Sequence, residues 1–470
     1  MSNINSKLFY HQIKALEGCS AFPFRLIYRL PGTGKTRIGV ELVKKQLCAK
    51  NDSMILWLGP ANLIMQYQKV FKEFNIEYNI FKPGFADMSS GICVITSYEM
   101  MRLHFVKFIN QRWDCVICDE FHRAKNHAAK TNSTLKKLRK RAASFFAFTG
   151  TPFQNSPYEF FELINLVAAK NLSFECESTL QYKRPKRSFI RNLLGKMGFN
   201  VKRINQGPVI GIAEPERLHE LIFRYIDYMQ PEKYIKECRL PVISERIEYI
   251  TLAEPEISSY LKILKTYRKV RERQFFNDEL DDERLEKTFN NLTALRQNLL
   301  SMNGKISSKI LSCVRDLKTV LNDKANRVLV FSNFVEHGLK QLEKVLDKES
   351  IKFNLYDGDT TIRQRRAILD EYFSGETPLM LLSPVGFEGL DLYGTTHIFV
   401  LDPHFNPERT RQLISRAVRA YSGVSEIKIC HYIAVINDKK HPCVDEAILR
   451  IANRKKFLAV MLESCLALNS

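Results

Sequence analysis

The stretch WDCVICDEFH, residues 113–122, places an acidic pair directly after a short apolar run. A run of this length, flanked by polar residues, is typical of a buried strand. Such a strand delivers Asp119 and Glu120 to its carboxyl end, where α/β sheets bind their ligands. Two adjacent carboxylates there suit metal binding and the activation of water. The alternative is a surface acidic pair that caps the next helix.

An upstream stretch, LPGTGKT at residues 30–36, follows the apolar run 24–28 and opens a helical pattern over 37–45. Glycines let backbone N–H groups approach phosphates, and the amino end of a helix favours negative charge. Lys35 is expected to reach the β and γ phosphates of ATP, and Thr36 to bind Mg²⁺. The full phosphate-loop pattern has glycine at position 29, where this chain has Arg29.

The acidic pair divides into two expected roles. Asp119 would hold the Mg²⁺ shell, and Glu120 would orient or deprotonate the attacking water. His122 is expected to couple the nucleotide site to the turn at residues 149–151, although an ordinary loop histidine is the alternative. Together, the loop and the acidic pair predict an ATP hydrolase.

The chain is strongly basic, with 71 Lys and Arg against 51 Asp and Glu in 470 residues and a net charge of +20. Such a charge favours a polyanionic partner. The basic runs at 136–141 and 183–187 could contact nucleic acid or form a solvated face, and the second could be a nuclear address. The sequence shows neither a secretory signal nor an apolar run of membrane-spanning length, which predicts an intracellular protein without a membrane partner.

Strand-like runs alternate with amphipathic helical patterns towards both ends of the chain, which predicts an α/β fold with parallel sheets flanked by helices. The expected strands are 24–28, 54–58, 92–95, 115–118, 145–148, 327–331, 379–382 and 397–401. Residues 155–320 are mostly helical in pattern, for example over 256–275 and 292–321. One strand pattern, 246–252, follows the break at Leu240-Pro241, where a second lobe is expected to start.

The stretch 409–419 has a helical pattern that would place Gln412, Arg416 and Arg419 on one face. Guanidinium groups supplied from a second lobe can stabilise charge on a γ phosphate. A solvated basic face is the alternative.

The order of these motifs resembles that of superfamily 2 ATPases, and more narrowly of the SWI/SNF-type double-stranded DNA translocases. The resemblance extends from about Leu8 to Leu462. Its most diagnostic stretch is TGTPFQNS at 149–156, because the family carries Thr-Gly-Thr-Pro-x-Gln-Asn at this point. Further matching stretches are LFYHQ (8–12), GPANL (59–63), ITSYE (95–99), VLVFSNF (328–334), YDGDT (356–360), GFEGLDL (386–392) and DPHFNP (402–407).

The resemblance implies two RecA-like lobes with helical insertions. The ATP-binding lobe would cover 1–240, with an insertion at about 155–235. The helicase C-terminal lobe would cover 241–470, with an insertion at about 255–320 and a terminal helix at about 441–468.

The resemblance also implies roles for individual residues. Those that would bind the nucleotide are Gln12, which would contact the base, and Gly32, Thr33, Gly34, Lys35, Thr36, Gly389 and Asp391. Those that would act in hydrolysis are Lys35, Asp119, Glu120, Gln412, Arg416 and Arg419, the last two as arginine fingers inserted when the lobes close on ATP. Mg²⁺ would be held by Thr36 and Asp119. Phosphate contacts to nucleic acid would come from Thr96, Ser97, Asn155, Asn333 and Ser383.

The chain departs from the family in several places. Its phosphate loop reads RLPGTGKT, where the family has Asp-Glu-Met-Gly-Leu-Gly-Lys-Thr. His404 replaces a tryptophan, and residues 420–422 replace Ile-Gly-Gln. None of these changes removes a catalytic group. The compact, Lys-rich and Phe-rich chain resembles versions carried by large DNA viruses and phages, so a viral factory or virion joins the nucleus and cytoplasm as an expected location.

The expected function is ATP-driven translocation along duplex DNA, which would remodel protein–DNA complexes in transcription, chromatin or repair. One alternative is a superfamily 2 helicase that unwinds RNA or DNA. Another is an ATP-gated transcription cofactor that acts on polymerase. The sequence does not identify the protein cargo, the direction of travel, the oligomeric state or the role of the basic segment 171–206.

Overall fold

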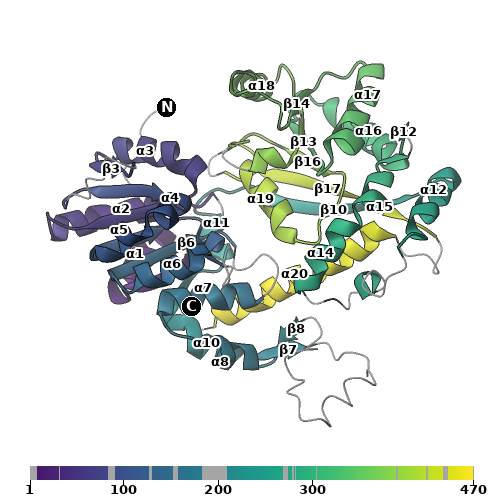
Figure 1. The fold of residues 1–470 in the computed structure, drawn as a ribbon. Coiled ribbons are helices and arrows are strands. Elements are labelled where there is room, and N and C mark those ends of the chain that lie inside the picture. Colours follow the sequence, from purple (N-terminus) through teal and green to yellow (C-terminus); the bar gives the residue numbers. More distant parts are fainter. Residues whose placement is uncertain are drawn as a thin grey trace, which may run out of the picture. The chain divides into compact units, whose positions relative to one another are not determined.

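The fold comprises two compact units, each built on its own sheet (Figure 1). The computed structural model describes residues 8–30, 32–82, 90–125, 130–151, 157–182, 209–267, 274–277, 280, 282–302, 304–387, 390–419, 422–437 and 443–468. The first unit is formed by 1–181, 211–239 and 457–470, and the second by 182–210 and 240–456. Assignment of the two halves of the chain as an ATP-binding lobe and a helicase C-terminal lobe stays a prediction.

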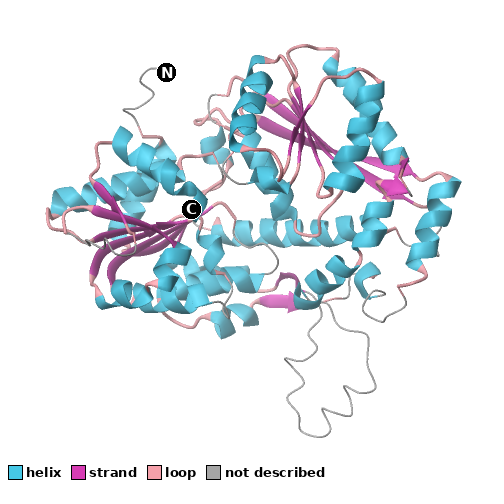
Figure 2. Ribbon diagram, turned by 45° about the horizontal axis from the view of Figure 1, so that its top comes forward, coloured by secondary structure: helices cyan, strands magenta, loops and turns pink. Residues whose placement is uncertain are grey.

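The sheet of the first unit has seven strands in the order β3-β4-β2-β5-β6-β1-β9. The strands of the sheets are drawn in magenta in Figure 2. All its neighbouring strands pair in parallel. The strands are β1 (Phe24–Tyr28), β2 (Ile55–Gly59), β3 (Tyr78–Ile80), β4 (Cys93–Ser97), β5 (Trp113–Cys118), β6 (Ala142–Thr149) and β9 (Ile226–Tyr228). The strand predicted before the acidic pair is therefore central in the sheet.

Helices cover both faces of this sheet, because its strands are apolar at successive positions. Ile55 and Trp57 belong to one apolar cluster with residues of α1, α2 and α3. The alternate residues Leu56 and Leu58 point to the other face and are equally buried. Helices α4, α6 and α7 contact the strands as well. The α-helices are α1 (Tyr10–Ala21), α2 (Lys35–Ala49), α3 (Ile64–Glu73), α4 (Tyr98–Leu103), α5 (Phe105–Asn110), α6 (Lys130–Arg139), α7 (Pro157–Ala168), α8 (Ser173–Ser178), α10 (Pro215–Ile222) and α11 (Glu232–Ile235). The 3₁₀ turns are η1 (Ala61–Leu63), η2 (Phe121–Ala124) and η3 (Phe223–Tyr225).

The sheet of the second unit has six strands in the order β10-β17-β16-β13-β15-β14, again all parallel. They are β10 (Val242–Thr251), β13 (Val328–Phe331), β14 (Asn354–Tyr356), β15 (Leu379–Leu382), β16 (His397–Val400) and β17 (Glu426–Val435). The predicted α/β fold class, with two RecA-like lobes of parallel strands flanked by helices, is confirmed. The sequence reading missed β3, β9, β14 and β17.

The helices of the second unit form two packed groups. One group packs on the sheet, and the other forms a separate apolar cluster that includes Phe289, Phe405 and Ile448. The helices are α12 (Glu254–Leu264), α14 (Asp282–Asn291), α15 (Thr293–Asn298), α16 (Ser308–Leu321), α17 (Lys340–Lys348), α18 (Ile362–Ser374), α19 (Pro407–Ala417) and the first part of α20 (Val444–Leu466), with the turns η4 (Val335–Leu339) and η5 (Pro384–Phe387). The residues of α20 from Phe457 onwards belong to the first unit. A further two-stranded sheet pairs β7 (Leu180–Tyr182) with β8 (Val209–Ile212).

The prediction of a continuous helix over 292–321 is wrong. An antiparallel hairpin of β11 (Ser301–Met302) and β12 (Lys305–Ile306) separates α15 from α16. Gly304 has a φ of 79°, a left-handed conformation that suits a tight turn and not a helix interior. Ser307 then caps α16, because its hydroxyl accepts a hydrogen bond from the N–H of Ile310 at 3.3 Å.

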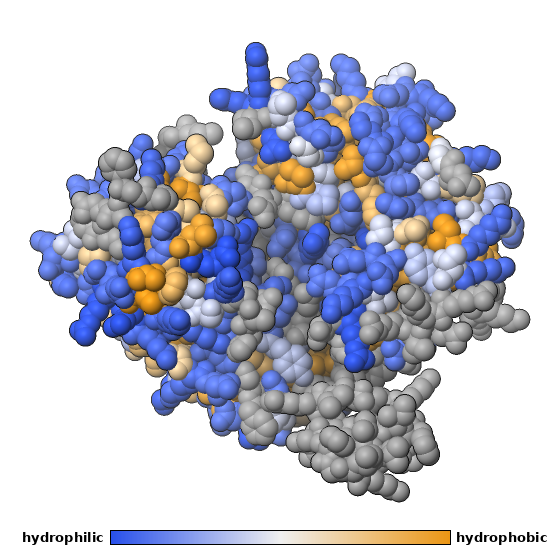
Figure 3. All heavy atoms as spheres, viewed as in Figure 1, coloured by the Kyte–Doolittle hydropathy of each residue, from blue (hydrophilic) through white to orange (hydrophobic). Residues whose placement is uncertain are grey.

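Hydrophilic side chains predominate on the face drawn in Figure 3, and the hydrophobic groups there are small and separate. The apolar residues are instead concentrated in the cores described above. Among the helices of the described residues, none combines the length and the apolarity that crossing a bilayer requires.

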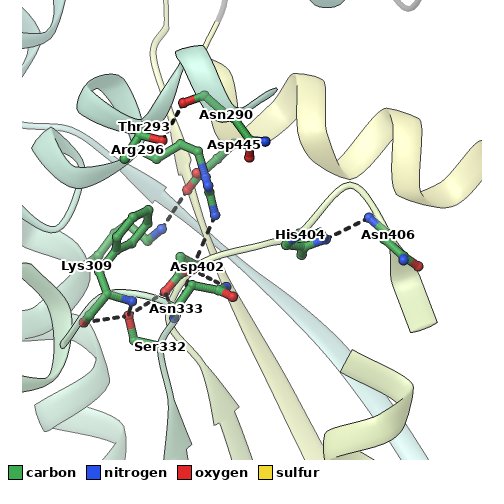
Figure 4. Close-up of polar contacts among 11 residues, drawn as sticks. Asn290, Thr293, Arg296, Lys309, Ser332, Asn333, Asp402, His404, Asn406 and Asp445 are labelled. Carbon is green, nitrogen blue, oxygen red and sulfur yellow. Dashed lines mark hydrogen bonds and ion pairs between the residues drawn. The ribbon is translucent and has the colours of Figure 1, made fainter. Parts of the chain in front are cut away.

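A buried polar network ties the helical part of the second unit to the ends of its strands (Figure 4). The Asp402 carboxylate accepts hydrogen bonds from the Ser332 hydroxyl at 2.5 Å and from the Asn333 amide side chain at 2.6 Å. Arg296 of α15 lies 3.7 Å from the same carboxylate, with its guanidinium over the Phe289 and Phe334 rings. One carboxylate therefore holds two loops and an inserted helix together.

His404 lies beside this network. Its Nδ1 accepts a hydrogen bond from the N–H of Asn406 at 3.0 Å. Burial, followed by the charges of Arg409, Arg296 and Lys455, lowers the pKa of His404 to about 2. Between that value and the ordinary 6.5, the unfolded chain binds a proton that the folded chain does not bind. The free energy of unfolding therefore falls as the pH drops below 6.5.

We predict that His404→Phe removes this pH dependence, because phenylalanine fills the site without titrating. Below pH 6.5 the natural chain should lose unfolding free energy faster than the variant, by up to about 1.4 kcal/mol per pH unit. Urea unfolding at about pH 7.5, 6 and 5 measures the difference. Parallel curves for the two proteins would contradict the assignment.

Candidate nucleotide site

The predicted nucleotide motifs of the first unit meet at one edge of its sheet. The phosphate loop follows β1, the acidic pair follows β5, and the turn at 149–151 follows β6. In the sheet β6 lies between β5 and β1, and all three strands run in parallel. Their carboxyl ends therefore bring the three motifs together, as in other α/β sheets that bind ligands.

The phosphate loop requires its glycines. Gly32 and Gly34 have φ values of 79° and 78°, which side chains rarely adopt. A Cβ at Gly34 would also lie 2.6 Å from Nε2 of Gln12. The loop can therefore approach a phosphate closely.

Helix α1 holds the phosphate loop from outside. The Thr33 carbonyl accepts hydrogen bonds from Nε2 of His11 at 2.9 Å and from Nε2 of Gln12 at 3.3 Å. Burial lowers the pKa of His11, which favours its neutral form. The structure thus brings Gln12 to the loop, and its contact with the adenine base stays a prediction.

Lys35 begins α2 and turns back over the loop. Its ammonium donates hydrogen bonds to the carbonyls of Arg29 and Leu30, both at 3.3 Å. Burial and the Glu120 charge raise the pKa of Asp119, and the Lys35 charge opposes this rise. Lys35 therefore lies where a phosphate held by the loop would meet a cation.

Arg29, the departure from the phosphate-loop pattern, is fully buried. Its guanidinium donates to the Asp227 carboxylate at 2.5 Å, to the Asp227 carbonyl at 2.8 Å and to the Tyr28 carbonyl at 2.9 Å. Asp227 belongs to β9, which pairs with β1. The strand β9 thus supplies the partner of the large, charged residue at position 29. The sequence analysis missed Asp227, for which no motif gives a signal.

The acidic pair differs in burial. Asp119 is buried, whereas the Glu120 side chain is one-third exposed. Burial, followed by the Glu120 charge, raises the pKa of Asp119 to about 6, and Lys35 opposes this rise. His122 lies close to Glu120, with 3.3 Å between Nδ1 and Oε2. The predicted coupling of His122 to the turn at 149–151 stays a prediction.

Two tyrosines that the sequence analysis did not assign hold Asp119. The Tyr67 hydroxyl donates to its carboxylate at 3.0 Å, and the Tyr98 hydroxyl donates to its carbonyl at 2.7 Å. Gly59 makes room for Tyr67, because a Cβ there would lie 2.5 Å from the tyrosine hydroxyl. Tyr98 belongs to the quoted motif at 95–99, whereas Tyr67 has no motif that could have marked it.

The donors present fit a magnesium ion. Asp119 offers a carboxylate whose raised pKa would return towards its ordinary value beside a cation. Mg²⁺ prefers such oxygen ligands and usually keeps several waters. Thr36 lies in the first turn of α2, next to Lys35. The two predicted ligands are thus suitable, and their role stays a prediction.

The predicted arginine fingers lie in the second unit, and their role stays a prediction, but the helix expected over 409–419 is wrong at its end. Gln412 and Arg416 belong to α19, but this helix ends at Ala417, before Arg419. The Arg419 guanidinium folds back and donates to the carbonyls of Ser415 and Val418. Arginine near a helix end can satisfy in this way the carbonyls that the helix leaves unpaired. Its Nε also donates to Asp391 at 2.6 Å.

The five predicted nucleic-acid contacts fall into three groups. Thr96, Ser97 and Ser383 are buried, and Ser97 caps α4 through the N–H of Met100. Asn333 is partly buried and bonded to Asp402. Asn155 lies outside the described residues, as does Gly389 of the nucleotide set. None of these roles is tested by the structure.

The basic run 136–141 is divided between structural and exposed roles. Arg139 is buried and stacks at 3.4 Å on the Phe24 ring, while Lys136 pairs with Glu162 at 2.6 Å. Lys140 and Arg141 line a cavity of about 790 Å³ at the amino ends of the strands, opposite the phosphate loop. The run at 183–187 lies outside the described residues.

Comparison with known families shows the class of protein. The family described as "SNF2-related domain" matches residues 86–325, just over half of the chain. The family "Helicase conserved C-terminal domain" matches 309–421, and "Type III restriction enzyme, res subunit" matches 5–154. The chain therefore belongs to the SNF2-related family. Its matched domains are helicase-like and of SWI/SNF type.

Curated relatives are DNA repair and recombination proteins. The chain is 26% identical to RAD54B of Homo sapiens over 81% of its length, and 24% identical to RAD54-like of Drosophila willistoni over 91%. It spans 45% and 58% of those two proteins. Among solved structures, the "Sulfolobus solfataricus SWI2/SNF2 ATPase core in complex with dsDNA" matches 98% of this chain and 94% of its own, at 15% identity and a TM-score of 0.43.

We predict that Asp227→Asn destabilises the chain by about 3 kcal/mol, because it leaves the Arg29 charge buried and unpaired. Arg29→Met combined with Asp227→Leu should recover most of that loss, since apolar residues can replace a buried pair. Urea unfolding of the single and double variants measures both effects. A double variant less stable than Asp227→Asn would refute the pairing as the cause.

Proposed function

We propose that this ATPase hydrolyses ATP to move along duplex DNA and so remodels protein–DNA complexes. The observation that carries the proposal is the meeting of the loop at Gly32–Lys35 with Asp119 and Glu120 at one sheet edge. The loop offers backbone N–H groups and a lysine to phosphates. The acidic pair offers one buried and one partly exposed carboxylate, which suits two different roles.

In this proposal the residues of the first unit divide the work. Lys35 binds the β and γ phosphates, and Gln12 lies against the loop where the base would be recognised. Asp119 and Thr36 hold Mg²⁺, which neutralises phosphate charge when bound. Glu120 orients the attacking water and accepts its proton, because its carboxylate is the more exposed of the pair. Arg416 and Arg419 are the proposed fingers of the second unit.

Two observations support DNA as the partner. The net charge is +20, and the curated relatives are named as DNA repair and recombination proteins. A polyanion would be bound mainly through its phosphates, so binding would be independent of sequence and sensitive to salt. The contacts proposed for Thr96, Ser97, Asn155, Asn333 and Ser383 are of this kind.

We predict that Lys35→Ala and Glu120→Gln abolish ATP hydrolysis while the fold is kept. The first removes the cation at the phosphates, and the second removes the base. Steady-state hydrolysis, with circular dichroism to check folding, measures the effect. Lys45→Ala in the same helix and the exposed Glu17→Gln are matched controls that should hydrolyse normally. Normal hydrolysis by either test variant would refute the site.

We predict that duplex DNA stimulates hydrolysis more than single-stranded DNA or structured RNA does, and that raised salt removes this stimulation. Displacement of a third strand from duplex DNA, dependent on ATP, would report movement without unwinding. Stimulation by RNA together with strand separation would instead favour a helicase. A polymerase effect that survives Glu120→Gln would favour the transcription cofactor.

A further inference from the structure

The peptide group that links Asp119 to Glu120 is held at both of its polar ends. Its carbonyl oxygen accepts the hydrogen bond from the Tyr98 hydroxyl at 2.7 Å. Its N–H donates to the Asp119 carboxylate at 2.9 Å. Because the peptide group is planar, its orientation sets the φ angle of Glu120, the residue that follows.

Glu120 has a backbone conformation that non-glycine residues rarely adopt. Its φ is 48° and its ψ is 49°, in the left-handed region. Such a conformation persists only where the surroundings hold it, and it is common at active sites. The bond from Tyr98 is one of the contacts that holds it.

We propose that Tyr98 is a positioning residue for hydrolysis, which keeps Glu120 left-handed and thereby sets the place of its carboxylate. The inference rests on the proposed function, because it takes Glu120 as the group that orients the attacking water. Tyr98 touches the peptide backbone of the acidic pair and acts through Glu120.

The surroundings of Tyr98 fit this role. Its side chain is buried, and its hydroxyl donates to the Asp119 carbonyl. It is the first residue of α4, which Ser97 caps, so the backbone that carries it is fixed. Arg123 and Glu99 form a second link, at 3.5 Å, between α4 and the turn after Glu120.

The inference gives the motif at 95–99 a role towards the nucleotide. The resemblance assigns Thr96 and Ser97 of this motif to nucleic-acid contacts, yet Thr96, Ser97 and Tyr98 are all buried. Tyr67, from α3, contacts the Asp119 carboxylate and not the peptide group. The two tyrosines therefore hold different parts of the acidic pair.

The test is Tyr98→Phe, which removes the hydroxyl and keeps the buried ring. We expect kcat to fall about tenfold to a hundredfold, because small displacements of a catalytic group have effects of this size. The KM for ATP and the affinity for a fluorescent ATP analogue should stay within about twofold, since Lys35 and the loop are untouched. The matched control is Tyr372→Phe, because the Tyr372 hydroxyl is also buried and bonded, 2.8 Å from the Thr395 hydroxyl.

A normal kcat in Tyr98→Phe would overturn the inference. So would a rise in KM alone, or an equal loss of kcat in Tyr372→Phe, which would assign the effect to general destabilisation. Glu120→Gln separates the two proposals. If it is inactive while Tyr98→Phe is normal, the inference fails and the proposed site stands. If Glu120→Gln hydrolyses ATP normally, both fail.

Discussion

Parallel pairing of β5, β6 and β1 is the constraint on which the candidate site depends. In a parallel sheet every strand ends at the same edge, so the residues that follow neighbouring strands lie close together even when they are far apart in sequence. Cys118, Thr149 and Tyr28 end these strands. The loops that follow them supply the acidic pair, the turn and the phosphate-binding glycines. Burial on both faces fixes the strands, because neither face could be exposed without exposing apolar side chains.

Buried ion pairs join separate elements within each of the two units. Arg29 joins β1 to Asp227 of the short strand β9, and Lys309 joins α16 to Asp445 of α20 at 2.6 Å. Arg296 connects α15 to Asp402. A buried pair adds little net stability over apolar packing, but a wrongly placed segment would leave a charge unpaired, at a cost of about 3 to 5 kcal/mol. The pairs therefore specify arrangement more than they add stability.

The sequence predicted most of the fold and the position of the nucleotide motifs, because apolar runs and phosphate-loop glycines are local signals. The strand β1 was predicted with its observed bounds. Gln12 and Lys35 contact the phosphate loop, and Asp119 lies at the same edge of the sheet. Three-residue strands such as β9 were missed, since three residues carry no periodicity. The prediction that Arg419 shares a helical face with Gln412 and Arg416 was wrong, because α19 ends at Ala417. The periodicity of the sequence does not determine the residue at which a helix ends. Tyr67 and Asp227 could be identified only from the structure, because their partners lie far from them in the sequence.

Hydrogen bonds hold the described residues of the phosphate loop, which would limit the entropy cost of binding a phosphate. The Thr33 hydroxyl donates to the Leu30 carbonyl at 2.7 Å, and α1 donates to the Thr33 carbonyl. Lys35 already lies over the loop, bonded to two neutral carbonyls. When phosphate oxygens arrive, Lys35 exchanges neutral acceptors for charged ones, and charge-assisted hydrogen bonds are about twice as strong. Little backbone entropy would then be lost at Thr33, because its hydroxyl and its carbonyl are already hydrogen-bonded. Strain is kept instead at Glu120, where the left-handed backbone costs about 1 to 2 kcal/mol. In the proposed function, the site is therefore held by hydrogen bonds where phosphate would bind and strained where water would be oriented.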